Sequence, residues 1–463
     1  MNNVNVRINR ATIKNIKNVR NGTINLNNVA KDTFGASIVG VYGQNGSGKT
    51  ALVWAMELVK SAISGEKIPD DAFYYVHQNS KSAIIDLDFS VVLQDREYCV
   101  MYSIEIAKTP ENAVSIINES LEFNAPKNDT QPKITKTKIL AVKAGDTEEL
   151  DKCLYGPETR ITEMMSIDKQ VRQKFLVLQA LAKEKNCSFI FNEKTMELLK
   201  EVYKDTIYIE VLKTLQFYGR INMFVLNRNS ESSFNMNLLP LSMRLSSDSM
   251  ITKSDHVLVG LGRNTSNVEA YDTICKVFDQ INILIGEIVP ELRIDVKEIS
   301  RQFNENVEEQ VSFELFSMRN DIPTPLRYES EGIKKILCIL SSLIAMYNNH
   351  SIFVAIDEMD AGIFEYLLGE ILGIINKTGK GQLLFTSHNM RPLEVLENDN
   401  IYFTTTNSEN KYIQFTGIKD GHNLRTTLLR TIDLGGQKES VYETTSSYQI
   451  AKAFRKARNI ANG

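Results

Sequence analysis

The chain is poor in cysteine, proline and tryptophan for its 463 residues. Its five cysteines form no C-x-x-C pair, which argues against a zinc site or a disulfide framework and favours a reducing compartment. Ten prolines and 24 glycines exclude a collagen-like or Pro/Gly-rich disordered chain. The longest strongly apolar run, residues 336–346, is about half the length of a membrane span. Residues 1–7 hold no apolar core of a secretion signal. We therefore expect a large globular protein of the cytoplasm without a membrane partner.

Positive charge is in slight deficit overall, but it gathers at the two ends of the chain. The formal net charge is −4. Residues 1–70 hold nine Lys or Arg and four Asp or Glu, and residues 411–463 hold nine and four again. Each end thus carries +5, which leaves −14 for the residues between them. Two basic ends suit a polyanion such as DNA or RNA, and equally an acidic protein surface or a nucleotide.

One local motif is specific on its own. Residues 43–50 match G-x-x-x-x-G-K-[ST] at every required position. An apolar run at 36–42 predicts a buried strand before the motif, and residues 51–58 predict a helix after it. The pattern therefore predicts a phosphate-binding loop between a strand and a helix. Its members are Gly43, Gln44, Asn45, Gly46, Ser47, Gly48, Lys49 and Thr50.

The residue types of this loop explain the chemistry that we expect of it. Glycines let the backbone curl until successive N–H groups point at phosphate oxygens, and the helix N-terminus adds partial positive charge. We expect Lys49 to reach the β- and γ-phosphates and the Thr50 hydroxyl to bind Mg²⁺.

A second half of the same site is predicted far downstream. The apolar strand 351–356 ends in Asp357, which we expect to hold Mg²⁺, and Glu358, which we expect to activate an attacking water. The next apolar strand, 381–386, leads to His388. The carboxyl ends of strands in a doubly wound sheet face the nucleotide, so we expect His388 to contact the γ-phosphate or the water.

A third element precedes the acidic strand. Ser330 is placed to cap a helix whose apolar residues follow helical spacing from Ile333 to Ile344. The Ser330-x-Gly332 start, followed by two lysines, again offers N–H groups to an anion.

The order of these four motifs resembles that of the ABC-type ATPase head. The resemblance implies ATP as substrate and a head-to-tail dimer, in which Ser330 and Gly332 of one chain complete the ATP site of the other. The segment 357–361 is also similar to the Asp-Glu-Val-Asp-Ala segment of SMC proteins. Phe364 stands where the loop of that family closes with Asp.

The spacing between the motifs narrows the choice of ATPase subfamily. Lys49 and Asp357 lie 308 residues apart, which is too far for a transporter ATPase, and no sustained heptads indicate an SMC coiled coil. The motifs, with the opening segment 13–18, are similar to the prokaryotic OLD-like (AAA15) ATPases. That group includes ATPase subunits of abortive-infection, Septu and PARIS anti-phage systems.

This resemblance implies a slow ATPase that assembles through composite ATP sites, senses a phage-encoded trigger and controls a separately encoded effector, a nuclease or toxin. Two alternatives stay open: a DNA-repair ATPase of the SMC/RecF type, whose basic ends hold DNA, and a scaffold that binds ATP with little turnover.

The expected fold class is α/β, a P-loop NTPase head of the ABC type with an antiparallel β subdomain and a helical insertion. Alternating apolar residues predict a hairpin over 83–106, and Gln78 is our candidate for the glutamine that senses the γ-phosphate in such heads. The expected domains are an N-terminal ATPase lobe (1–107), a mostly helical insertion (108–295), a C-terminal ATPase lobe (296–405) and a basic extension (406–463).

Two stretches have more specific expectations. Residues 229–250 are rich in Ser, Asn and Met, which predicts an irregular loop. The 75 residues after His388 are few for a metal-binding Toprim nuclease, and the acids that they offer, Asp420, Asp433, Glu439 and Glu443, are dispersed between basic residues, which does not suit one. Gly435-Gly436 predicts a turn, and residues 451–458 predict a basic terminal helix that faces solvent, a partner or nucleic acid.

Overall fold

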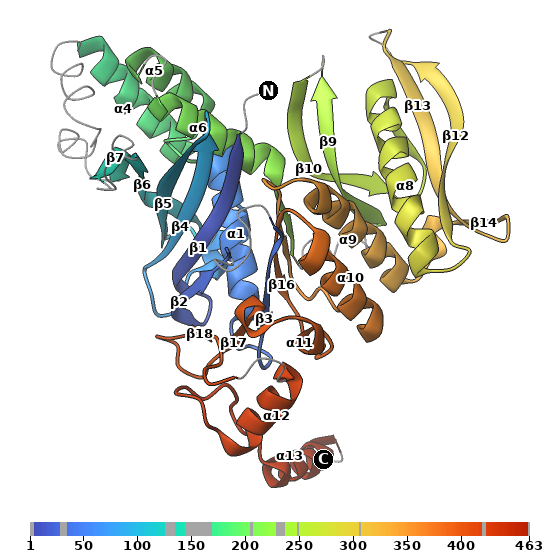
Figure 1. The fold of residues 1–463 in the computed structure, drawn as a ribbon. Helices are drawn as coiled ribbons and strands as arrows, with labels where there is room; N and C mark the ends of the chain where they lie inside the picture. The colour runs from blue at the N-terminus through green and yellow to red at the C-terminus, as the bar shows by residue number, and fades with distance from the viewer. Residues whose placement is uncertain are drawn as a thin grey trace.

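The computed structural model describes residues 4–27, 35–125, 135–143, 169–203, 207–227, 237–247, 250–304, 307–418 and 423–461. Asp420 and residues 229–236 and 248–249 of the loop expected at 229–250 lie outside these ranges. The described chain has a central head, an antiparallel sheet on one side of it, a second lobe on the other side, and a C-terminal extension at its base (Figure 1).

A six-stranded sheet forms the centre of the head, and its strands run parallel except at one edge. β3 lies beside β16, and β16 lies beside β15, so the strands predicted to carry the three motifs are neighbours. In sheet order the strands are β18 (Tyr412–Ile413), β17 (Ile401–Thr404), β3 (Ser37–Tyr42), β16 (Gln382–Thr386), β15 (Phe353–Ile356) and β8 (Met223–Leu226).

The sheet separates two hydrophobic cores because successive side chains of a strand point to opposite faces. Val39 and Val41 of β3 pack with α1 (Lys49–Ser64) and the antiparallel sheet. Ile38 and Tyr42 pack in the other core, with α9 (Glu331–Asn348) and α10 (Glu365–Thr378). A strand buried on both faces reads as a continuous apolar run, which is why 36–42 could be identified from sequence.

The antiparallel sheet confirms the predicted hairpin and extends it. β4 and β5 pair antiparallel, with Ala83 opposite Ile106 and Val91 opposite Tyr98. In sheet order the strands are β2 (Val19–Asn25), β1 (Asn5–Ile16), β4 (Ser82–Leu93), β5 (Arg96–Lys108), β6 (Val114–Ala125) and β7 (Thr135–Lys143).

The prediction of a mostly helical insertion at 108–295 is wrong for a large part of that range. Helices do occur there: α4 (Lys169–Glu184), α5 (Glu193–Tyr203), α6 (Ile207–Phe217), the short η3 (Tyr218–Asn222) and α8 (Val268–Ile288). However, β6 and β7 extend the antiparallel sheet, and β8 joins the central one. The four apolar residues of β8 show no periodicity that separates a strand from a helix.

A second lobe follows in the chain. α8 packs on a sheet of β11 (Asn264–Asn267), β13 (Glu309–Arg319), β12 (Arg293–Phe303) and β14 (Ile322–Pro325), and it also packs against α9. The pair β9 (Leu238–Ser247) and β10 (Met250–Gly260) joins this lobe to the head. The described residues at 238–247 and 250 are strand, so the loop expected at 229–250 is wrong for them.

The C-terminal extension is mostly helical. It holds α12 (Leu424–Leu434) and α13 (Ser447–Ala461), which confirms the basic terminal helix. Gly435 ends α12 at a φ of 71° and Gly436 follows at 108°, which confirms the predicted turn at a position where a side chain would strain the backbone. Short helical turns elsewhere are η1 (Asp70–Tyr75), η4 (Leu326–Tyr328), α11 (Pro392–Val395) and η5 (Asn398–Asn400).

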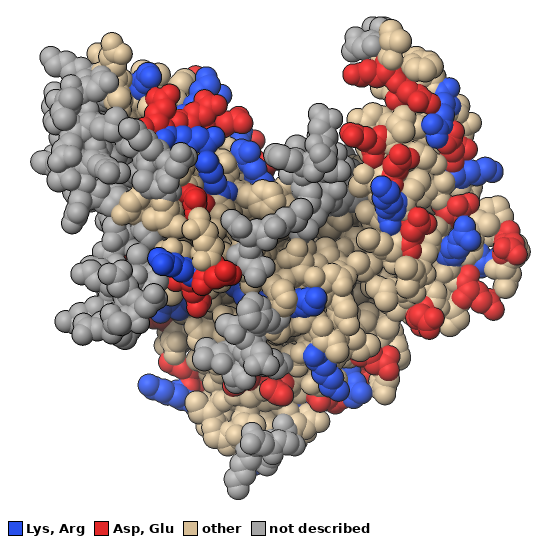
Figure 2. Space-filling view, turned by 45° about the horizontal axis from the view of Figure 1, so that its top comes forward, with Lys and Arg blue, Asp and Glu red and all other residues tan. Residues whose placement is uncertain are grey.

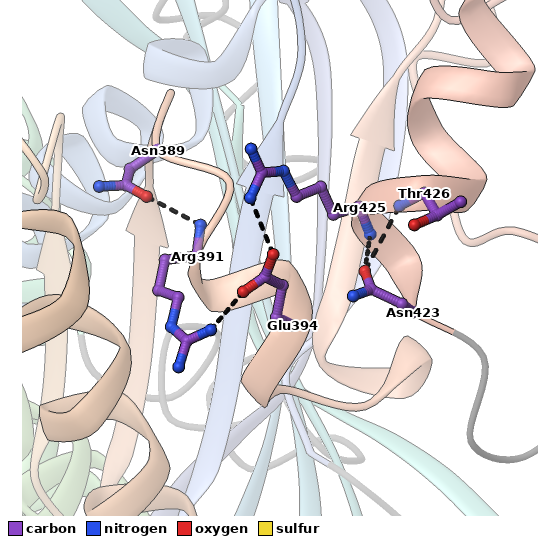
Figure 3. A network of polar contacts seen from close by, with 6 residues as sticks. All are labelled: Asn389, Arg391, Glu394, Asn423, Arg425 and Thr426. Carbon is purple, nitrogen blue, oxygen red and sulfur yellow. Dashed lines mark hydrogen bonds and ion pairs between the residues drawn. The ribbon is translucent and has the colours of Figure 1, made fainter.

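Glu394 ties α12 to the loop that follows β16 (Figure 3). Its carboxylate accepts hydrogen bonds from Arg391 and, at 2.8 Å, from Arg425 of α12, and these two guanidinium groups lower the pKa of Glu394. Asn389 accepts from the Arg391 N–H at 2.8 Å, and Asn423 caps α12 by accepting from the N–H of Arg425. The extension therefore folds as part of the head.

A buried glutamine joins the central sheet to the antiparallel sheet. The Gln382 side chain accepts from the Ile8 N–H at 2.7 Å and donates to the carbonyls of Ile8 and Leu26 at 2.8 and 3.1 Å. Each buried main-chain group that loses its partner costs about 1–3 kcal/mol.

Within the described ranges, no helix has the length and apolar character of a membrane span.

We predict that Gln382→Leu lowers the free energy of unfolding by about 2–4 kcal/mol, because it leaves the main-chain groups of Ile8 buried without partners. Urea denaturation followed by circular dichroism measures the loss. Gln302→Leu, an exposed position on β12, is the matched control and should change stability little. Equal stability of the two variants would contradict this assignment.

Candidate nucleotide-binding site

The predicted phosphate-binding loop lies between the end of β3 and the start of α1. Gly46 and Gly48 adopt φ values of 73° and 105°, which side chains rarely tolerate. A Cβ on Gly48 would lie 2.8 Å from Val19, so the backbone approaches β2 too closely for any other residue. The loop therefore has the tight curvature that turns N–H groups toward phosphate oxygens.

Lys49 is held inside the curve of this loop. Its ammonium donates to the carbonyls of Gly43 and Gln44 at 2.8 and 3.2 Å, and the side chain is 6% exposed. A buried ammonium within the loop is where a lysine must lie to neutralise the outer phosphates of a nucleotide.

The C-terminal extension and the adjoining strands support the loop from behind. Thr404 donates to the Ser47 hydroxyl at 2.7 Å, and Tyr412 donates to the Gly48 carbonyl at 2.8 Å. The Gln44 side chain makes two hydrogen bonds with the main chain of Glu443, to its N–H at 2.9 Å and its carbonyl at 3.4 Å. Residues up to 443 thus belong to the site's scaffold, which no local motif indicated.

The two predicted metal ligands meet across the sheet. Asp357, 3% exposed at the end of β15, accepts from the Thr50 hydroxyl at 3.2 Å and from Thr386 at 2.6 Å. Thr386 in turn accepts from the Glu358 N–H at 2.8 Å. One threonine between the two strands therefore sets the positions of both acids. Thr386 lies in the strand predicted before His388, but its residue type alone gave no indication of this role.

Glu358 and His388 both border the cavity in front of the loop, as predicted. Glu358 has a φ of 48°, a left-handed conformation that non-glycine residues seldom adopt, and such residues cluster at functional sites. Asp360 accepts from the N–H groups of His388 and Asn389, each at 3.1 Å, which connects the loop after β15 with the loop after β16.

The cavity has a volume of about 1160 Å³, large enough for a nucleotide. The loop residues from Asn45 to Thr50 line it, and so does Gln78, the candidate γ-phosphate sensor. Residues that sequence reasoning missed also border it: Lys17, Asn18, Trp54, Tyr74, His77 and Asp360.

Lys17 is the most notable of the missed residues. Its ammonium lies 3.5 Å from the ring centre of Trp54 and 5.3 Å from that of Tyr75, which is a cation–π contact. Burial lowers the pKa of Lys17 to about 8, although nearby Asp71 opposes the shift. Lys17 and Trp54 come from β1–β2 and α1, so only the folded chain brings them together.

Ser330 and Gly332 lie outside this cavity. Ser330 caps α9, as predicted, by accepting from the Ile333 N–H at 3.3 Å. A Cβ on Gly332 would lie 2.5 Å from the Gly362 carbonyl, so α9 touches the loop after β15 at its backbone. Lys335, one turn further along α9, donates to the Glu358 carbonyl at 2.7 Å. The start of α9 is thus attached to the main chain of Glu358 in its own chain, while Ser330 faces outward.

The residues present suit a magnesium ion bound with a nucleotide. A hydroxyl and a buried carboxylate that share a hydrogen bond beside the loop are the two protein ligands that such an ion uses, with phosphate oxygens and waters as the rest. Elsewhere in the described part of the chain, no group of three His, Cys, Asp or Glu side chains forms a metal site.

The family model described as an AAA ATPase domain (AAA_15) matches residues 7–391, most of the chain. The chain therefore belongs to the AAA_15 family of AAA ATPase domains. This membership confirms the ATPase assignment, and the match spans the loop, the acidic strand and the histidine strand. No curated protein matches the chain in sequence.

Solved structures show a similar arrangement at low sequence identity. An Smc head bound to the C-terminal winged-helix domain of ScpA is 11% identical, with a TM-score of 0.41, and the match covers 88% of this chain and 98% of that one. The SMC head domain of Thermotoga maritima is 12% identical (TM-score 0.37; 88% and 99% covered). The recombination mediator RecF with ATP is also 12% identical (TM-score 0.35; 83% and 93% covered).

We predict that ATP binds more weakly as pH rises from 7 to 9, by up to about tenfold, because Lys17 loses its positive charge around its pKa of about 8. Lys17→Met should bind weakly at pH 7 and lose this pH dependence. Titration with a fluorescent ATP analogue measures both. Lys14→Met, which changes an exposed lysine on β1 just before the turn that holds Lys17, is the control. The same pH slope in wild type and Lys17→Met would refute the role.

Proposed function

We propose that this chain binds and slowly hydrolyses ATP at composite sites of a head-to-tail dimer, and that the ATP-bound dimer is the state that acts on a partner. The observation that carries the proposal is the chain of hydrogen bonds that joins Thr50, Asp357, Thr386 and the Glu358 N–H. The hydroxyl and the carboxylate that we propose as metal ligands are thereby held beside Glu358, which supports the proposal.

The roles of the residues follow from this geometry. Lys49 and the loop N–H groups bind the phosphates, while Thr50 and Asp357 are positioned to hold Mg²⁺, which neutralises charge on the phosphates when bound. Glu358 accepts a proton from the attacking water, and His388 contacts the γ-phosphate from the opposite loop. Gln78, in the turn before β4, contacts the γ-phosphate.

Exposed side chains around the start of α9 support the proposed dimer. Ser330 faces solvent outside its own cavity, and two large aromatic side chains flank the contact between Gly332 and Gly362. Phe364 is 74% exposed and Tyr328 is 72% exposed. Large apolar groups in solvent beside a polar helix start are typical of an interface. Phe364, at the position where SMC proteins have Asp, would then make an apolar contact across the dimer.

The start of α9 also gives the dimer a way to respond to ATP. The phosphates of an ATP bound in one chain would bind N–H groups at the start of α9, near Ser330, in the other chain and displace that helix. Because Lys335 of α9 donates to the Glu358 carbonyl, the displacement would reach the Glu358 backbone. ATP bound at one site would therefore affect the position of Glu358 at the other site. Control of a separately encoded effector in anti-phage defence, in the cytoplasm, is the part of the proposal that rests on the motif resemblance to OLD-like ATPases.

We expect Glu358→Gln to bind ATP but to release phosphate at least about a hundredfold more slowly, because the amide cannot accept the proton of the attacking water. The dimer should then persist in ATP. Phosphate release and sedimentation velocity, with and without ATP, measure the two effects.

Glu397→Gln, an exposed acid beyond the histidine loop, is the matched control and should behave as wild type. Two results count against the proposal: phosphate release at the wild-type rate, or an identical sedimentation profile of Glu358→Gln with and without ATP.

A further inference from the structure

The terminal helix α13 makes no packing contact that buries it. Every described side chain from Ser447 to Arg458 is exposed, and Figure 1 shows α13 extending away from the head beyond α12. A helix of 15 residues is marginally stable in water by itself, so such a helix gains its stability from a surface that it binds. Nothing in the described part of its own chain supplies that surface.

One face of α13 is apolar and the other is cationic. Ile450, Ala453, Phe454 and Ala457 recur at helical spacing, and Phe454 is 73% exposed. Lys452, Arg455, Lys456 and Arg458 form the other face, and the helix contains no acidic residue. Two α13 helices would repel each other, so the complementary surface must be acidic with an apolar centre.

The outer face of α8 has this chemistry. Its inner face is buried on the second lobe, while its exposed acids recur along the other side: Glu269, Asp272, Asp279 and Glu287, interrupted by Lys276. Ile283 and Leu284 lie exposed on the same face, Ile283 at 75%. Figure 2 shows acidic side chains, with basic ones among them, over the lobe that carries α8.

These two faces cannot meet within one molecule, because α13 lies at the base of the head and α8 on the far lobe (Figure 1). α13 follows Glu443, which is bound to Gln44 of the phosphate-binding loop. α8 packs against α9, which carries Ser330 and Gly332. The cationic helix α13 therefore lies on the side of the head that carries the phosphate-binding loop, and the acidic face of α8 lies on the side that carries α9.

We propose that α13 of one chain docks on the outer face of α8 of a second copy. Phe454 packs against Ile283 and Leu284, and Lys456 and Arg458, at the edges of the cationic face, pair with Asp279 and Glu287. Like the proposed ATP dimer, this contact joins the loop side of one head to the α9 side of another, but it needs no nucleotide. Its test is therefore independent of the proposed function.

A charge swap tests the contact in the full-length protein without nucleotide. The α13 variant K456E/R458E and the α8 variant D279K/E287K should each associate with themselves roughly tenfold or more weakly than wild type. An equimolar mixture of the two should associate again, because each reversed face then meets an opposite charge. Sedimentation velocity in low salt measures all three, and K183E/K185E, a reversal of exposed lysines near the end of α4, is the control.

Phe454→Asp should weaken association as the charge variants do, since it removes the apolar centre while leaving the cations. The proposal is overturned if the wild type is monomeric without nucleotide, or if the mixed charge variants do not associate. It is also overturned if K456E/R458E abolishes binding to DNA or to anionic phosphatidylserine vesicles but leaves self-association unchanged.

Discussion

The shared hydrogen bonds of Asp357 are the interaction on which this site depends. Its buried carboxylate accepts from Thr50 of α1 and from Thr386 of β16, which brings together the ends of three neighbouring segments. A buried carboxylate is costly unless it is paired or hydrogen-bonded, so these contacts fix where the loop, the acid and the next strand lie relative to one another. Glu358 is placed by the same threonine, with its backbone in a left-handed conformation.

From this point, contacts lead outward to both sides of the head. Asp360 receives the N–H groups of His388 and Asn389, and Lys335 of α9 reaches the Glu358 carbonyl. On the other side, the extension holds the loop through Gln44 and Glu443. The surfaces that would meet a second chain are therefore joined by hydrogen bonds to Glu358 on one side and to the phosphate-binding loop on the other, which is what an assembly controlled by ATP requires.

Much of the site was predictable because its motifs are local. A phosphate-binding loop needs glycines at fixed positions, and a buried strand that ends in an acid shows as an apolar run, so residues 43–50, Asp357 and Glu358 could be assigned before any fold was known. Lys17 could not, because its position on Trp54 depends on how β1 crosses α1. The strand β8 was missed for a similar reason: its pairing partner β15 lies far away in sequence, and its short apolar run has no distinguishing period. The missed strands β6 and β7 instead pair with their chain neighbours, in the order β5, β6 and β7.

The central claim is that each ATP site is built from two chains, and a mixing experiment tests it most directly. Lys49→Ala removes the phosphate contact of one chain, and Ser330→Arg blocks the helix start that we expect to act on the other. Each variant alone should hydrolyse no ATP. An equimolar mixture should recover about a quarter of the wild-type rate, since half of the dimers are mixed and each has one intact site. Full activity of Ser330→Arg alone, or a mixture that stays inactive, would contradict the account.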